Sequence, residues 1–185
     1  MIAQQEGGGK PKSFPIEVEK KKWTRSKRYK KWVRTLKTKK AEIHHTSEED
    51  MCVGKKTICK GDLGIPRKYM PQFNTSAEIR EFRQFIKKVY DIKSCKKTKQ
   101  ALELRPSQGE INRARIKKLI EDKIFEKVII PLIVSNDGYV VDGHHRWAAF
   151  RSEHPTKRIP VVMIDAPIKD VLGIAVAWGA KHQQF

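Results

Sequence analysis

The sequence predicts a small mixed α/β domain in its C-terminal half, joined to a basic extension at the N-terminus. Residues 128–134 (VIIPLIV) form an apolar run typical of a strand buried on both faces. Residues 136–138 (NDG) are typical of a hairpin turn, which leads into a second strand at residues 139–141. Another apolar run at residues 159–164 predicts a third strand, and residues 168–176 a final helix.

Helix signals precede and separate these strands. Thr75 and its neighbours are expected to cap a helix that runs to about Val89, with an apolar stripe at Ile79, Phe82, Phe85 and Ile86. Ser107 and Glu110 have the spacing of a capping box at the start of a helix that ends near residue 122. Residues 104–108 before it are expected to be extended, and residues 146–151 begin a further helix.

The chain divides by composition into three parts. Residues 1–40 are predicted to be a basic, partly disordered arm, residues 41–99 a helical and irregular extension with a proline-rich loop, and residues 100–185 the catalytic domain. Within the second part, residues 41–63 are expected to be irregular, and residues 93–99 a basic connector.

The net charge of +19 is concentrated at the front, where residues 1–40 hold 14 Lys and Arg against 3 Asp and Glu. A segment with this charge is expected to bind a polyanion, and DNA is the expected partner. The alternatives to DNA binding are that the arm is a solubilising tail or that it binds an anionic membrane surface. Within the arm, Trp23, Arg28 and Trp32 are candidate DNA contacts, although the aromatic residues would serve equally well to anchor a helix.

The three cysteines, Cys52, Cys59 and Cys95, contain no C-x-x-C pair. This pattern favours reduced thiols over a zinc site or a disulfide framework, and with it a cytoplasmic location. No apolar stretch approaches the roughly 20 residues that a membrane-spanning helix needs, so no membrane partner is expected.

The residues best suited to binding a ligand or to catalysis are Asp142, Gly143, His144, His145 and Arg146. They follow a predicted strand and open a predicted helix, where glycine allows a sharp turn and the free amides favour an anion. Arginine suits phosphate oxygens, and histidine donates to phosphate or transfers a proton. The acid has three possible roles: binding a divalent metal, orienting a histidine or accepting a proton. Alternatively, it caps the helix while the histidines pack.

This arrangement resembles the ParB/sulfiredoxin family. The segment at residues 104–108 (LRPSQ), the run at residues 131–134 and the stretch at residues 141–149 (VDGHHRWAA) match the family's order and spacing over about residues 100–175. A shorter match at residues 65–72 (IPRKYMPQ) resembles extensions on phage-borne members. The resemblance implies nucleotide binding at the turn, and a location in the host cytoplasm if a phage encodes the chain.

The family contains several activities, and the turn helps to separate them. Sulfiredoxins carry a cysteine where His144 stands, which disfavours sulfinic-acid reduction here. Partition ParB proteins usually have Gly-Glu-Arg-Arg at the turn and a helix-turn-helix domain after it, for which the chain to Phe185 leaves no room. The free-serine kinases are similar in reading Asp-Gly-His-His-Arg, and they use a glutamate near the start of the preceding helix, which Glu110 matches.

The resulting hypothesis is an ATP-dependent phosphotransferase acting on DNA, with hydroxymethylated pyrimidines such as 5-hydroxymethyluracil as possible acceptors. Glu110, Asp142 and His145 would be catalytic, the residues from Gly143 to Arg146 would hold the nucleotide phosphates, and Asp142 would bind Mg²⁺. A metal-dependent nuclease and a non-catalytic, nucleotide-gated DNA-binding protein are the alternatives. Further candidate contacts to substrate or DNA are Arg67, Gln72, Gln108 and Trp178, the last with a core or lid role as its alternative.

Overall fold

The structure is a computed structural model that describes residues 34, 46, 48–54 and 57–181. The predicted contacts Trp23, Arg28 and Trp32, and nearly all of the basic arm, lie outside the described residues. None of the described helices has the length and apolar character needed to cross a membrane.

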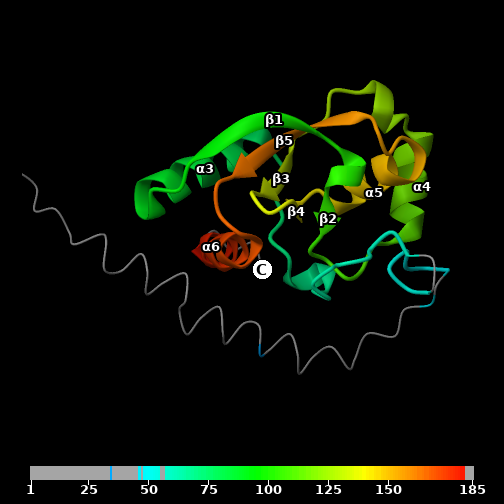
Figure 1. Cartoon of the computed structure of the whole chain (residues 1–185), viewed down its shortest axis with the longest axis horizontal. Coiled ribbons are helices and arrows are strands. Elements are labelled where there is room, and N and C mark those ends of the chain that lie inside the picture. Colours follow the sequence, from blue (N-terminus) through cyan, green and yellow to red (C-terminus); the bar gives the residue numbers. More distant parts are fainter. Residues whose placement is uncertain (1–33, 35–45, 47, 55–56, 182–185) are drawn as a thin grey trace, which may run out of the picture.

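A five-stranded mixed sheet organises the described residues, in the order β1-β5-β3-β4-β2 (Figure 1). β1 and β5 are antiparallel, β5 and β3 parallel, β3 and β4 an antiparallel hairpin, and β4 and β2 parallel. The predicted α/β fold class is therefore confirmed. The strands are β1 (Ser94–Gln100), β2 (Arg105–Pro106), β3 (Leu132–Ser135), β4 (Tyr139–Asp142) and β5 (Arg158–Ile164).

Within residues 57–181, four α-helices flank the sheet: α3 (Ser76–Tyr90), α4 (Arg113–Glu121), α5 (His144–Glu153) and α6 (Ile168–Lys181). The connections between these elements contain the short 3₁₀ helices η2 (Arg67–Tyr69), η3 (Ala101–Glu103) and η4 (Ile124–Glu126).

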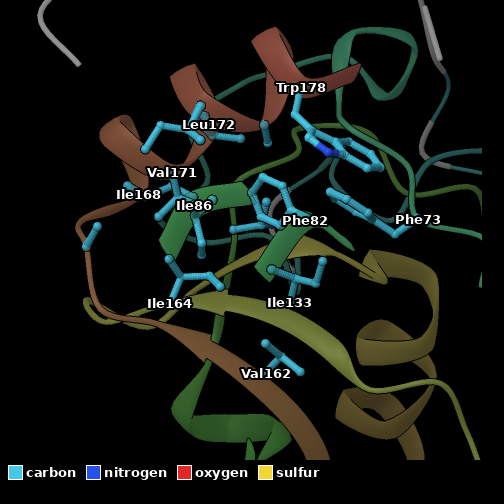
Figure 2. Packing of buried hydrophobic residues seen from close by; sticks show 14 of the residues in the cluster. Phe73, Phe82, Ile86, Ile133, Val162, Ile164, Ile168, Val171, Leu172 and Trp178 are labelled. Carbon is cyan, nitrogen blue, oxygen red and sulfur yellow. The ribbon is translucent and has the colours of Figure 1, made fainter. Parts of the chain in front are cut away.

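Alternate residues of each inner strand point to opposite faces of the sheet, which divides the core in two. Ile133 of β3 packs with α3 and α6 (Figure 2), as does Val141 of β4. Their neighbours Val134 and Val140 pack with α4 and α5. The α3–α6 core thus draws on residues from both sides of the predicted division at residue 100.

One connector prediction and one strand prediction were wrong. Residues 94–100 form β1 instead of a basic connector, because the backbone pairs with β5 along the whole strand although no side chain of β1 is buried. Conversely, the run predicted from residue 128 becomes a strand only at Leu132, and Val128 is fully exposed. Backbone pairing, which periodicity does not detect, decides both cases.

The helix starts confirm one prediction and correct another. Thr75 caps α3, accepting the amide of Glu78 at 3.1 Å. The predicted capping box of Ser107 and Glu110 is wrong: α4 starts at Arg113, and its cap is Asn112, which accepts the amide of Arg115 at 2.9 Å. The Ser107 hydroxyl instead donates to the Val140 carbonyl at 2.6 Å.

Residues 48–63 contain no helix or strand where they are described, but they hold a disulfide that the sequence reading did not expect. Cys52 and Cys59 are bonded, with their Cα atoms 5.0 Å apart, whereas Cys95 is free and exposed. The expectation of three reduced thiols is therefore wrong for two of them. A turn brings the pair together: the Thr57 hydroxyl donates to the Met51 carbonyl at 2.8 Å.

Candidate functional site

A cavity of about 250 Å³ lies where the β4–α5 turn meets the proline-rich loop. Four stretches of the sequence form its wall, and they include most of the residues predicted for the site. The lining residues are Arg67, Gln72, Phe73, Asn74, Gln108, Ile130, Asp142, Gly143, His144, His145 and Arg146.

Gly143 makes the turn between β4 and α5 possible. Its φ of +92° lies in a region that favours glycine, and a Cβ there would stand 2.5 Å from Leu132 Cδ2 and 2.9 Å from Arg146 Nη2. Glycine is therefore required for both the backbone conformation and the space. The turn directs the start of α5, with its free amides and partial positive charge, at the cavity wall.

Asp142 and Arg146 form a largely buried pair beside this turn. Arg146 Nη2 lies 3.3 Å from Asp142 Oδ2, and Arg146 Nη1 donates to the Ile130 carbonyl. Burial raises the pKa of Asp142 from 3.8 to about 6, against the opposing influence of Arg146 and the amides of Gly143 and Phe73. Burial also lowers the pKa of Arg146. The pair fixes the end of β4 and places one carboxylate in the cavity wall.

His144 and His145 are adjacent in sequence but occupy different environments. The His144 ring is buried, and its Nε2 accepts the amides of Ser107 and Gln108, each at 3.3 Å. Burial lowers the pKa of His144 from 6.5 to about 3, so the ring is neutral. This side chain ties the β2–α4 connection to the turn. His144 also lines the cavity, and its contact with phosphate stays a prediction.

His145 is the histidine that can address a ligand. Its Nε2 accepts the Asn112 amide at 3.2 Å, which leaves Nδ1 to carry the proton and donate. Burial, followed by the charges of Arg67 and Arg115, lowers the pKa of His145 from 6.5 to about 4. A neutral ring with its acceptor nitrogen occupied suits hydrogen bonding to an anion better than proton abstraction.

Arg115 was missed by the sequence reading. It lies in the first turn of α4, close enough to lower the pKa values of both Arg67 and His145. Placing the helix start at Ser107 hid it, since that start puts Arg115 in mid-helix. Recognising Asn112 as the cap would have placed this arginine beside the site.

The proline-rich loop contributes Arg67 and Gln72 to the cavity wall, and their contact with substrate or DNA stays a prediction. Arg67 Nη2 lies 3.3 Å from Gln72 Oε1, and the Arg67 amide donates to Glu110 Oε2 at 3.0 Å. Burial lowers the pKa of Arg67, with Arg115 acting in the same direction and Glu110 and Asp142 against it. Glu110 therefore lies beside Arg67 and positions the loop without lining the cavity. Gln108 lines the cavity and is almost fully buried.

Trp178, by contrast, lies in the hydrophobic core (Figure 2). Its ring stacks on Phe73 with centroids 5.1 Å apart and meets the edge of Phe82 at 5.6 Å. The core alternative for Trp178 is confirmed, and a closing role over a base does not fit. Because Phe73 also lines the cavity, Trp178 supports one wall of the site from behind.

The predicted metal ligand Asp142 has its carboxylate already engaged by Arg146 and by the amides of Gly143 and Phe73. In the part of the chain that the structure describes, no three His, Cys, Asp or Glu side chains form a group able to hold a metal ion. The described arrangement therefore does not fit a protein-held Mg²⁺ at Asp142, whose metal role stays a prediction.

Comparisons with known proteins give one weak likeness. No family model matches the chain, and no curated protein matches it significantly. A solved structure, the N-domain of a pNOB8-like ParB protein, matches with 19% identity over 41% of this chain and 29% of that chain, at a TM-score of 0.30. The match thus spans less than a third of the compared chain. A likeness of this extent assigns neither a family nor a function.

Proposed function

We propose that the protein is an ATP-dependent phosphotransferase that acts on DNA, with hydroxymethyl groups of modified pyrimidines as its acceptors. The observation that carries this proposal is the convergence of the α5 start, Arg67 and His145 on one small cavity. Free helix amides, a guanidinium and an imidazole N–H are the donors that bind phosphate oxygens. The basic composition of residues 1–40 supports DNA as the acceptor.

The cavity size fits the phosphates of a nucleotide better than a whole nucleotide. Pockets that enclose a complete small ligand occupy roughly 300–1,000 Å³, above the 250 Å³ of this cavity. The polyphosphate would occupy the cavity, with the nucleoside outside it. Phosphoryl transfer depends mainly on positioning and charge neutralisation, which such a cavity supplies.

Asp142 is the best-placed general base. It is the only carboxylate among the described lining residues, and its pKa of about 6 suits proton transfer at neutral pH. In the proposed step the acceptor hydroxyl oxygen bonds to the γ-phosphorus, its proton passes to Asp142, and ADP leaves. Glu110, predicted as the base, would act instead by holding the amide of Arg67.

The proposal is tested with γ-labelled ATP, Mg²⁺ and duplexes that contain or lack 5-hydroxymethyluracil. We expect label on intact DNA only when the hydroxymethyl group is present. Asp142→Asn should reduce the rate of label transfer by about 10²–10⁴-fold, as for loss of a general base. Nicked DNA without label would indicate a nuclease, and release of phosphate alone an NTPase. Either result contradicts the proposal.

A matched pair of arginine and lysine variants tests the nucleotide site itself. Arg67→Ala removes a cavity-lining charge, whereas Lys68→Ala removes an exposed charge on the same 3₁₀ helix that does not line the cavity. A lost charge-assisted hydrogen bond is worth roughly 1.5–3 kcal/mol, so Arg67→Ala should weaken ATP binding by about 10–150-fold. Lys68→Ala should leave it unchanged. Equal losses of affinity in the two variants would mean that ATP binding depends only on the net charge of the protein.

A further inference from the structure

A second, larger hollow lies between α3 and β1, with a volume of about 1100 Å³. We call it the α3–β1 groove. Its lining carries six positive side chains and, within the described residues, a single acid, Asp165. The positive residues are Arg80, Arg83, Lys87, Lys88, Lys93 and Lys97.

Most of these charges are not neutralised within the described part of the chain. Lys87 pairs with Asp91 at 2.5 Å, and Arg83 Nε donates to the Ser94 hydroxyl at 2.9 Å, which joins helix to strand. Arg80, Lys88, Lys93 and Lys97 form no ion pair with a described residue and are exposed. Like charges gathered in one groove repel each other, and a polyanion relieves that repulsion.

Protection of the sheet edge explains only part of this charge. β1 is an edge strand, and lysines on an edge strand hinder pairing with other chains. That role accounts for Lys97, but not for Arg80 and Lys88, which lie on α3 and have no edge to protect. Residues from a helix and a strand therefore contribute to one basic surface, although neither element needs the charge for its own packing.

We propose that the α3–β1 groove binds the phosphate backbone of duplex DNA. Proteins that hold single strands stack bases on aromatic side chains, and no described lining residue of the groove is aromatic. Lysine and arginine contacts to phosphates fix position without reading sequence. The groove lies on different elements from the cavity at Asp142–Arg146, so its role holds whichever reaction that cavity performs.

Two triple variants of the full chain test the groove, with the same loss of charge in each. α4 and the residues after it lie at the opposite end of the domain from α3 (Figure 1), which makes their exposed lysines a matched control. The groove variant is Lys88→Gln, Lys93→Gln and Lys97→Gln, and the control is Lys118→Gln, Lys123→Gln and Lys127→Gln.

Affinity for a fluorescent duplex of random sequence is measured without nucleotide over a range of salt concentrations. Each lost phosphate contact lowers the slope of log K against log salt by about 0.9, so the groove variant should lose about 2–3 units of slope. We expect it to bind at least about tenfold more weakly at roughly 0.1 M salt, and the control to stay within about twofold. Unchanged thermal melting shows that each variant is folded.

Several results would overturn the inference. Equal losses in the groove and control variants would mean that only net charge matters. A groove variant that loses binding to single strands or to phosphatidylserine vesicles, but keeps duplex binding, would assign the surface to another ligand. Failure of the proposed transferase is a separate outcome, since the groove variant should keep ATP binding whether or not label is transferred to DNA.

Discussion

Two adjacent histidines show how one residue step changes a side chain's role. Successive residues of a helix point about 100° apart, so the start of α5 buries the His144 ring against Ser107 and Gln108 and leaves His145 more accessible, although both line the cavity. The sequence predicted both as phosphate contacts, because both are histidines in the same turn between Gly143 and Arg146. The position of Ser107 and Gln108, which the His144 ring binds, is known only from the fold.

Both histidines should remain neutral well below their usual pKa. Each pKa is about 6.5 in the unfolded chain and lower in the fold, so the folded state binds fewer protons below pH 6.5. The free energy of unfolding should therefore fall on acidification from pH 6.5, by about 1.4 kcal/mol per pH unit for each histidine, until the folded pKa is reached. The raised pKa of Asp142 acts in the opposite direction between pH 3.8 and about 6.

Imidazole nitrogen shifts followed by NMR, together with urea unfolding at pH 7 and pH 5, check this expectation. His144 should show one protonated nitrogen throughout that range. Titration of His144 near pH 6.5 would contradict the buried, hydrogen-bonded ring.

Gly143 should tolerate no side chain, for two separable reasons. Gly143→Ala imposes an unfavourable φ and a contact with Leu132, whereas Gly138→Ala has a similar φ of +85° and a nearest contact of 3.6 Å. Backbone strain alone costs about 1–3 kcal/mol, and the contact with Leu132 and Arg146 adds to it. Chemical unfolding should show a larger loss for Gly143→Ala, together with weaker ATP binding. Equal losses would remove the steric part of this explanation.

At the scale of elements, the sequence predicted those whose side chains carry a pattern. The apolar stripe and cap of α3, the hairpin of β3 and β4, and β5 were all predictable from periodicity and turn residues. β1 was not, since Ser94–Gln100 has no apolar alternation and depends on backbone pairing with β5. The start of α4 was misplaced because serine commonly caps helices, whereas the Ser107 hydroxyl donates to the Val140 carbonyl in β4.

The Cys52–Cys59 disulfide is expected to stabilise the fold. The Cys52–Cys59 bond closes a short loop, and Asp50 accepts the amides of Cys52 and Ile111, which joins this loop to the segment before α4. Replacing both cysteines with serine should lower the free energy of unfolding by about 2 kcal/mol, the loop-closure value for this length. Cys95→Ser, at an exposed free thiol, should have no effect. No difference between these variants in urea unfolding would contradict a formed bond.

At the scale of the whole molecule, the sequence identified most members of the site but not their assembly. Arg67, Gln72, Gln108 and the turn at Asp142 were each selected from local motifs, and the fold brings them to one cavity. The fold also puts Arg115 near enough to lower the pKa of His145, and it places Trp178 in the core. The α3–β1 groove likewise combines charges from separate elements, which a net charge cannot locate.

The central claim is that nucleotide phosphates bind at the start of α5, and titration of ATP into isotopically labelled protein tests it most directly. Amide shifts should move first at Gly143, His145 and Arg146, and at Arg67 across the cavity. These changes should persist in Lys68→Ala and need about 10–150-fold more ATP in Arg67→Ala. Shifts confined to the α3–β1 groove, or no shifts at the turn, would contradict the claim.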